Sequence, residues 1–261
     1  MDWRSLIMAT CISGISVMLP SQIPPAKNSL KQLPAEMSQQ KLQQQAAAIS
    51  LRIRSGGRVV GTGIAIRKQG SQYAVLTNEH VLKAGKAPYQ IQTPDNKIYQ
   101  GLEVKNANFK GNDLAMLHFT SSVEYTTTKL GVQPPKVGDA VFAGGFPFAD
   151  EGAKDRGFVF KAGKVSHVLE KALEGGYQIG YTNDIEKGMS GGPLLNAGGE
   201  LVGVNGVHAY PLWGDPYQYK DGTEPAPALR EQMSKYSWGI PIATFKELAP
   251  TGFEMTNSLQ K

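Results

Sequence analysis

The chain has 261 residues, of which 41% are hydrophobic and 19% are charged. This balance excludes wholesale disorder, and the length suffices for one large domain or for two small barrels that share a core. The formal net charge of +5 is small for this length, and no basic run is interleaved with aromatic residues, so a nucleic-acid-binding surface is not indicated.

The N-terminal segment has the pattern of an export signal. A short head with one arginine precedes an apolar run of about 14 residues that ends at Pro20. A membrane-spanning helix needs about 20 apolar residues, so a secretory signal peptide over residues 1–21 is favoured over an uncleaved membrane anchor. We therefore expect an exported protein, either periplasmic or extracellular.

A linker, a helix and several strands are predicted next. Residues 22–37 contain Pro, Ser and Lys and are typical of a linker. Ser38–Ala48 has high helix propensity and begins with a serine that can cap the helix. Ile49–Arg54 alternates apolar and polar residues, which predicts a strand. Two further strands are predicted at Arg58–Ile66, whose glycines suggest a bend or bulge, and at Tyr73–Thr77.

His80 lies just beyond the last of these strands, in the segment Leu76-Thr-Asn-Glu-His-Val-Leu82. A histidine at a strand end is more often structural than catalytic. This segment and the earlier Gly61-Thr-Gly63, however, resemble the surroundings of the catalytic histidine in trypsin-like serine proteases, especially in their high-temperature-requirement (Deg-type) branch. The resemblance implies that His80 is a general base.

Asp113 stands immediately before another apolar strand, in Gly111-Asn-Asp-Leu-Ala-Met-Leu117. Asn-Asp is also ordinary turn chemistry. The segment resembles the family pattern Asn-Asp-Ile/Leu-Ala-Leu-Leu, in which a buried carboxylate accepts the imidazole N–H and stabilises the imidazolium. Asp113 is therefore the predicted acid of a catalytic triad, and Asp139, in the turn Val137-Gly-Asp139, is a weaker candidate.

The segment Gly188-Met-Ser-Gly-Gly-Pro-Leu-Leu195 carries the strongest motif. A serine hydroxyl needs a base beside it to act as a nucleophile, and backbone N–H groups must converge on the developing oxyanion. Glycines on both sides of the serine permit the positive φ angles that turn these amides inward, although a plain glycine-rich turn has the same composition. We predict Ser190 as the nucleophile and the N–H groups of Gly188 and Ser190 as the oxyanion hole.

The order of the three candidates, His, Asp and Ser, is that of the chymotrypsin fold and differs from those of α/β-hydrolases and subtilisins. The resemblance covers about residues 47–250. It includes Val137–Pro147, similar to the start of the second barrel, and Tyr236–Phe245, similar to the closing strand before a C-terminal helix. It implies an all-β fold of two six-stranded antiparallel β-barrels (chymotrypsin-like), with a short N-terminal helix and a C-terminal helix.

This resemblance also implies a domain organisation. We expect a protease domain over residues 38–250, with its first barrel at about 49–130 and its second at about 131–245. Residues 251–261 are then a C-terminal tail that is too short for a PDZ module, so the expectation is a stand-alone catalytic domain.

Met189 departs from the pattern of the digestive trypsin-like enzymes. Those enzymes carry an Asp immediately before the nucleophile, and it pairs with a newly cleaved N-terminus. A methionine cannot form that ion pair, and the chain also lacks the disulfides of those enzymes. We therefore expect activity without a zymogen-type switch, as in the Deg-type branch.

The predicted substrate-binding residues are Asp184, Gly206, Val207 and His208. Asp184 precedes Ser190 by six residues, where trypsin-like enzymes have the floor of the primary pocket. A buried carboxylate there would select Lys or Arg, whereas in the alternative reading Asn183-Asp184 is a loop pair and Asp184 faces solvent.

The segment 206–208 is expected to bind the substrate backbone as an added strand. In trypsin a glycine stands at the position of His208 and keeps the pocket open. His208 therefore either narrows the pocket or engages an acidic substrate side chain, as a nearby histidine does in glutamyl-specific relatives.

The sequence offers little for disulfides or metal binding. A single cysteine, Cys11, excludes an intrachain disulfide and a cysteine-based zinc site. The four histidines have no His-x-x-x-His spacing and no neighbouring carboxylate cluster, so we expect no metal, and no cofactor is predicted.

The predicted function is that of a serine endopeptidase, which cleaves polypeptide substrates through a Ser-His-Asp triad and an acyl-enzyme intermediate. Nucleic acid is not an expected partner, and a membrane is one only if the N-terminal segment is an uncleaved anchor. The main alternative is a catalytically inactive, peptide-binding relative, against which the intact triad argues. A second alternative, an esterase, is disfavoured by the chain order and the strand-rich pattern.

Overall fold

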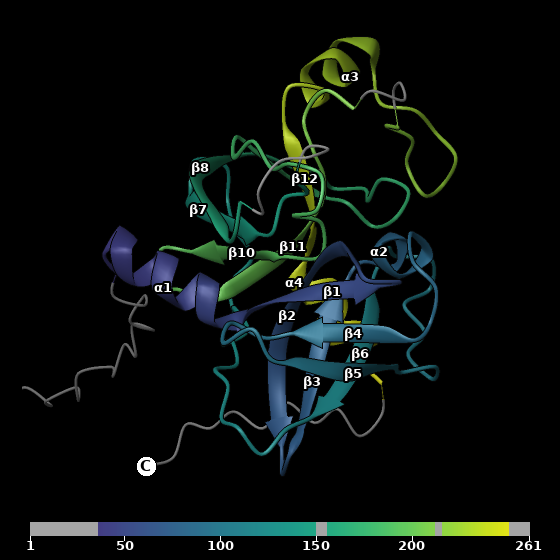
Figure 1. Ribbon diagram of the computed structural model, residues 1–261. Coiled ribbons are helices and arrows are strands. Elements are labelled where there is room, and N and C mark those ends of the chain that lie inside the picture. The colour runs from purple at the N-terminus through teal and green to yellow at the C-terminus, as the bar shows by residue number, and fades with distance from the viewer. Residues whose placement is uncertain (1–35, 150–155, 212–215, 251–261) are drawn as a thin grey trace, which may run out of the picture. The chain divides into compact units, whose positions relative to one another are not determined.

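The first barrel is a closed antiparallel sheet. In a computed structural model that describes residues 36–149, 156–211 and 216–250, its six strands are hydrogen-bonded in the order β1-β2-β3-β6-β5-β4 (Figure 1). A two-residue turn, Gly56-Gly57, joins the first two strands, because Ser55 pairs with Arg58. The strands are β1 (Ser50–Ser55), β2 (Arg58–Gln69), β3 (Gln72–Thr77), β4 (Tyr89–Gln92), β5 (Ile98–Glu103) and β6 (Ala115–Thr120).

The second barrel repeats this architecture with the strand order β10-β11-β12-β9-β8-β7. All of its pairings are antiparallel. Two closed six-stranded antiparallel barrels confirm the predicted fold class. The strands are β7 (Ala140–Gly145), β8 (Val159–Val168), β9 (Ile179–Tyr181), β10 (Pro193–Asn196), β11 (Leu201–Val207) and β12 (Ser237–Pro241).

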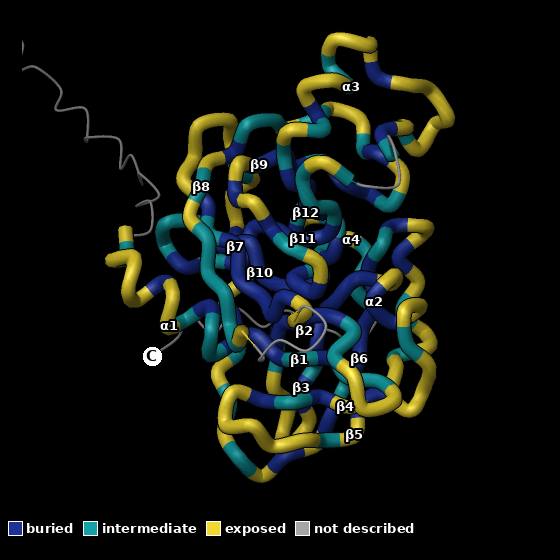
Figure 2. Tube along the Cα trace, turned by 45° about the horizontal axis from the view of Figure 1, so that its top comes forward, coloured by how far each residue is buried: buried dark blue, intermediate teal, exposed yellow. Residues whose placement is uncertain are grey.

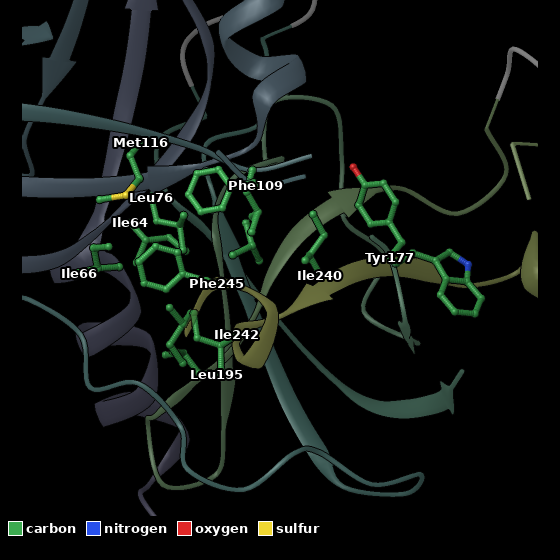
Figure 3. Close-up of a cluster of buried hydrophobic side chains, with 14 of the residues drawn as sticks. Ile64, Ile66, Leu76, Phe109, Met116, Tyr177, Leu195, Ile240, Ile242 and Phe245 are labelled. Atoms are coloured by element: carbon green, nitrogen blue, oxygen red, sulfur yellow. The ribbon is translucent and has the colours of Figure 1, made fainter. Parts of the chain in front are cut away.

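Buried apolar side chains fill each barrel and also the space between them. One cluster lies inside the first barrel and a second inside the other. A third cluster combines Ile64, Leu76 and Met116 of the first barrel with Leu195 and Ile240 of the second (Figure 3). Because burial of apolar area stabilises proteins by about 25 cal/mol per Å², this shared core holds the barrels against each other. All described residues belong to one compact unit of the chain.

Two of the helices were expected from the sequence. α1 (Gln39–Ile49) begins after Ser38, whose side chain accepts a hydrogen bond from the N–H of Lys41 at 3.4 Å. It buries Leu42, Ala46 and Ile49 and packs on β7 and β8. The C-terminal helix, α4 (Ile242–Leu248), adds Phe245 to the shared core.

The closing strand is shorter than predicted. β12 ends at Pro241, and α4 begins at Ile242, so residues 242–245 of the expected strand Tyr236–Phe245 are helical. Two further helices were not predicted: α2 (Glu79–Lys83) and α3 (Pro227–Met233). α2 has only five residues, and helices of that length depend on tertiary contacts rather than on intrinsic propensity.

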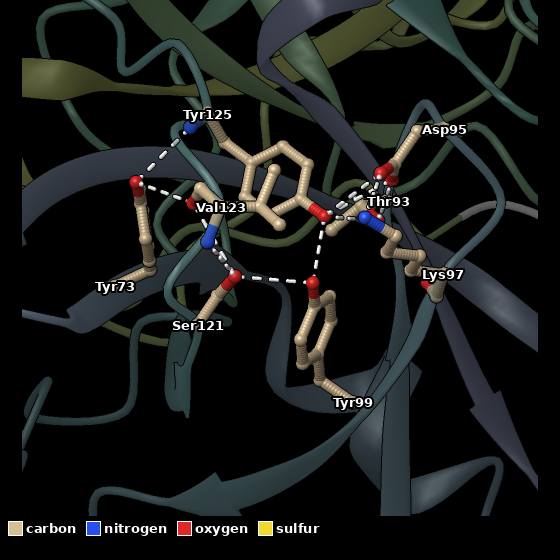
Figure 4. A network of polar contacts seen from close by, with 8 residues as sticks. All are labelled: Tyr73, Thr93, Asp95, Lys97, Tyr99, Ser121, Val123 and Tyr125. Carbon is tan, nitrogen blue, oxygen red and sulfur yellow. Dashed lines mark hydrogen bonds and ion pairs between the residues drawn. The ribbon is translucent and has the colours of Figure 1, made fainter.

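A polar network ties together the strands of the first barrel and the segment that follows β6 (Figure 4). Asp95 accepts hydrogen bonds from the hydroxyls of Thr93, at 2.5 Å, and Tyr125, at 3.0 Å. The Tyr125 hydroxyl also lies 2.8 Å from that of Tyr99, to which Ser121 donates at 3.0 Å. Because Ser121 and Tyr125 lie just after β6, the network anchors the start of the connection to the second barrel.

Several expectations fall outside the described residues: the signal peptide at 1–21, most of the linker at 22–37, and the tail at 251–261. Within the described ranges, no helix is long and apolar enough to cross a membrane.

Candidate active site

The register of β3 and β6 brings His80 and Asp113 together. Thr77, the last residue of β3, pairs with Ala115, the first residue of β6. The residues that follow β3 and precede β6 therefore meet at one end of the barrel. His80 Nδ1 lies 2.5 Å from Asp113 Oδ2, and the backbone N–H of His80 donates to Oδ1 at 2.8 Å.

The two side chains differ in their exposure to solvent. The Asp113 side chain is 14% exposed, whereas that of His80 is 46% exposed. Burial raises the pKa of Asp113, but hydrogen bonds from His80 and Tyr177 outweigh this effect and hold the pKa below its usual value. The carboxylate thus stays ionised and faces an imidazole that is partly exposed to solvent.

Both barrels fix the backbone of Asp113. Its carbonyl accepts a hydrogen bond from the side-chain amide of Asn78 at 2.7 Å, and its N–H donates to the carbonyl of Gly175 at 2.8 Å. Asn78 lies next to α2, while Gly175 belongs to the connection between β8 and β9 of the second barrel. The acid is therefore held from two directions.

The loop of Ser190 is shaped by glycines. Gly188 has φ +95° and Gly191 has φ +80°, and an added Cβ would lie 2.6 Å and 2.2 Å from the carbonyl oxygens of Phe146 and Thr62, respectively. Only glycine fits at both positions, as the sequence predicted. Within the described residues, neither the N–H of Gly188 nor that of Ser190 donates a hydrogen bond. Two unpaired amides are what an oxyanion hole requires.

Thr62 of β2 connects this loop to the first barrel. Its hydroxyl donates to the carbonyl of Gly188 at 2.8 Å and accepts from the N–H of Phe146 at 3.0 Å. Its own N–H donates to the carbonyl of Ser190 at 3.0 Å. Sequence reasoning noted Gly61-Thr-Gly63 only as part of a resemblance and missed the role of this threonine.

The Ser190 hydroxyl donates to the carbonyl of Gly206 at 3.0 Å. Among the described residues it makes no hydrogen bond with His80. The nucleophile and base that the sequence predicted are therefore not paired in this conformation.

β10 and β11, which flank the serine loop on the second barrel, are almost wholly buried (Figure 2).

Asp184 does not form a buried pocket floor. Its side chain is 80% exposed, and its nearest ionic partner is Lys161, with an N···O distance of 4.0 Å. The neighbouring Asn183 is buried and donates to the carbonyl of Val141 at 2.9 Å. Of the two readings of Asn183-Asp184, the solvent-facing one is correct, because the buried amide of Asn183 anchors the loop and leaves the next side chain outside.

The predicted substrate-binding segment lies at the end of β11. Gly206 is buried, and Val207 pairs with Trp238 of β12 after a bulge. His208 follows the strand, partly buried, with Nδ1 2.8 Å from the carbonyl oxygen of Ala209.

Met189 packs inside the second barrel, where it joins the cluster of Val141 and Leu194 and is fully buried. Nearby, Glu186 forms ion pairs with Arg156 and with Lys161, at 2.7 Å for the latter. Burial raises the pKa of Glu186, but these two cations outweigh it and lower the pKa overall. Elsewhere in the described ranges, no group of three or more His, Cys, Asp or Glu side chains could hold a metal ion.

Comparison with known proteins agrees with this geometry. Residues 61–204, more than half of the chain, match the family model of the trypsin-like peptidase domain. The magnetosome formation protease MamE of Magnetospirillum gryphiswaldense is 32% identical over 149 residues, which are 56% of this chain and 18% of that protein. The periplasmic pH-dependent serine endoprotease DegQ of Escherichia coli is 31% identical over 147 residues, which are 56% of this chain and 30% of DegQ.

Among solved structures, the serine endoprotease from Yersinia pestis superposes with a TM-score of 0.58 at 21% identity, covering 81% of this chain and 65% of that one. At this identity the likeness supports the fold. The family assignment rests on the domain match, and the named relatives indicate the branch. This chain therefore belongs to the trypsin-like peptidase family, in its Deg/HtrA branch.

Proposed function

We propose that this protein is a serine endopeptidase that cleaves polypeptides with His80, Asp113 and Ser190 as its catalytic triad. The observation that carries the proposal is the pairing of a buried Asp113 carboxylate with the exposed imidazole of His80 at 2.5 Å. The unpaired amides of Gly188 and Ser190 support it, since they can receive an oxyanion.

The mechanism follows from these groups. His80 Nε2 takes the proton of the Ser190 hydroxyl as Oγ attacks the scissile carbonyl carbon, and the oxyanion is stabilised by the Gly188 and Ser190 amides. The imidazolium, held by Asp113, then protonates the leaving amine as the C–N bond breaks, which leaves an acyl-enzyme. His80 next takes a proton from water, the resulting hydroxide displaces the acyl group, and Ser190 regains its proton.

Substrate binding would free the nucleophile. We place the substrate backbone along Gly206, Val207 and His208 as an added strand. A substrate N–H that donates to the Gly206 carbonyl would replace the Ser190 hydroxyl, which now holds that position at 3.0 Å. Rotation about the Cα–Cβ bond would then carry Oγ to His80. Apo enzymes often show such loose catalytic contacts.

Export is part of the proposal. The apolar pattern of residues 1–21 supports a signal peptide, and DegQ, a relative, is named as periplasmic. N-terminal sequencing of the protein recovered from the periplasm or the medium would identify a cleavage site, whereas an intact N-terminus in the membrane fraction would point to an anchor.

A fluorophosphonate probe tests the central claim. We expect it to label Ser190, as located by peptide mapping, and to fail in His80→Ala and Ser190→Ala. A folded wild-type protein that neither labels nor cleaves a peptide library would instead support the inactive, peptide-binding alternative.

A further inference from the structure

The connection between β8 and β9 reaches the acid of the proposed triad. Gly175 forms a parallel bridge with Asn112 and accepts the N–H of Asp113 at 2.8 Å. Two residues later, the hydroxyl of Tyr177 donates a hydrogen bond to Asp113 Oδ2, the same oxygen that faces His80 Nδ1. A side chain of the second barrel thus contacts the carboxylate of the first.

Two glycines confine the ring of Tyr177. An added Cβ at Gly206 would lie 2.1 Å from Cε1 of the ring, and one at Gly175 would lie 2.8 Å from Cε2. These are opposite edges of the ring, so side chains at either glycine would displace it. The ring also borders the shared core, at the side of Ile240 (Figure 3). Its hydroxyl therefore has one direction available, which is toward Asp113.

The hydroxyl is a donor at neutral pH. Burial and the charge of Asp113 raise the pKa of Tyr177 well above its usual value, so the phenol keeps its proton. An ionised carboxylate can only accept hydrogen bonds, so the direction of this one is fixed.

We propose that Tyr177 is a positioning residue that locks the orientation of the Asp113 carboxylate, so that Oδ2 is presented to His80 Nδ1 and Oδ1 to the backbone N–H of His80. This inference rests on the proposed triad. Without the hydroxyl, the two contacts with His80 remain, but the carboxylate loses its third one, so it rotates more easily about its Cβ–Cγ bond and holds the imidazole less firmly. Since the acid acts by holding the imidazole in the correct tautomer and orientation, its own orientation governs the chemical step.

The first test compares Tyr177→Phe with Tyr217→Phe. Both variants lose one buried tyrosine hydroxyl, but that of Tyr217 donates to the carbonyl of Met233 at 3.0 Å, away from the triad. We expect Tyr177→Phe to lower kcat on the order of tenfold with KM changed by less than about twofold, because an interaction that acts only through the triad is expressed in the transition state. Tyr217→Phe should retain wild-type kcat.

The second test is a double-mutant cycle with Asp113→Asn, read by the rate of fluorophosphonate labelling. If Tyr177 acts through the carboxylate, adding Tyr177→Phe to Asp113→Asn should slow labelling by less than about twofold, far less than it does in the wild-type background. Equal slowing of labelling in the wild-type and Asp113→Asn backgrounds would overturn the proposal. So would a wild-type kcat in Tyr177→Phe, or a Tyr177→Phe protein that does not fold.

A third readout needs no turnover. The proton between His80 Nδ1 and Asp113 should give a low-field ¹H NMR signal, which Tyr177→Phe shifts and Tyr217→Phe does not. A wild-type protein that never labels would refute the proposed protease activity, whereas an unshifted signal in Tyr177→Phe would refute the role of Tyr177.

Discussion

At the scale of single residues, the serine loop is held without the ion pair that digestive trypsin-like enzymes use. Met189 is buried among apolar side chains, and its N–H donates to the carbonyl of Glu186 at 2.9 Å. On the other side of Ser190, the N–H of Gly191 donates to the carbonyl of Asn205 at 2.8 Å. These contacts are formed by the folded barrel itself, so we expect activity that does not depend on a newly cleaved N-terminus.

The exposure of Asp184 leads to a prediction about specificity. Because the side chain is 80% exposed, a substrate cation gains little by pairing with it in high dielectric. We expect Asp184→Ala to leave the residue preference before the scissile bond unchanged, within about twofold in kcat/KM for each residue type. Cleavage of a peptide library followed by mass spectrometry measures this preference. A selective loss of cleavage after Lys and Arg in the variant would restore Asp184 as the specificity determinant.

At the scale of elements, the polar network of Figure 4 predicts how the first barrel responds to acid. Hydrogen bonds from Thr93, Tyr125 and Lys97 lower the pKa of Asp95 from 3.8 to about 2. A carboxyl whose folded-state pKa is depressed stabilises the fold above its unfolded-state value, and this contribution is lost as the pH falls through the folded-state pKa.

We therefore expect the wild type to exceed Asp95→Asn in Tm by a constant margin above about pH 4, and the margin to shrink as the pH falls toward 2. Thermal denaturation followed by circular dichroism between pH 2 and pH 7 measures it. Thr93→Ala removes the strongest donor and so raises the folded-state pKa of Asp95, which should reduce the margin at neutral pH and complete its loss at a higher pH. A margin independent of pH would contradict the assignment.

The elements also separate what the sequence could predict from what it could not. The surroundings of His80, Asp113 and Ser190 were recognisable because each motif is a short contiguous stretch. The partner of Asp113 was not, since Tyr177 is 64 residues away and meets it only when the β8–β9 connection packs on the first barrel. The interpretation of Asp184 as a buried pocket floor was wrong, because its offset of six residues from Ser190 fixes the position of the backbone and not the direction of the side chain.

At the scale of the whole molecule, the proposed site combines residues of both barrels. The first barrel supplies His80 and Asp113, and the second supplies Ser190. The shared apolar core sets the separation of the barrels, but apolar contacts are not directional. Hydrogen bonds between the barrels, from Thr62 to the serine loop and from Tyr177 to Asp113, can set the alignment of the proposed catalytic groups.

Thr62→Val is the most direct probe of this alignment. The substitution leaves the Gly188 carbonyl and the Phe146 N–H without their hydroxyl partner in a fully buried place, which should lower the free energy of unfolding by about 1–3 kcal/mol. We also expect kcat to fall by about tenfold to a hundredfold, because Gly188, whose carbonyl Thr62 holds, carries one of the proposed oxyanion donors on its N–H.

Thr128→Val is the matched control for this substitution. Thr128 is a buried threonine of the connection between the barrels, and its hydroxyl donates to the carbonyl of Lys129 at 3.3 Å. Urea denaturation and kcat, measured together, separate the two effects: the control should lose stability without a loss of kcat, whereas Thr62→Val should lose both. If both variants lost kcat in proportion to stability, the barrels would be aligned by their apolar core alone, and the polar contacts between them would have no catalytic role.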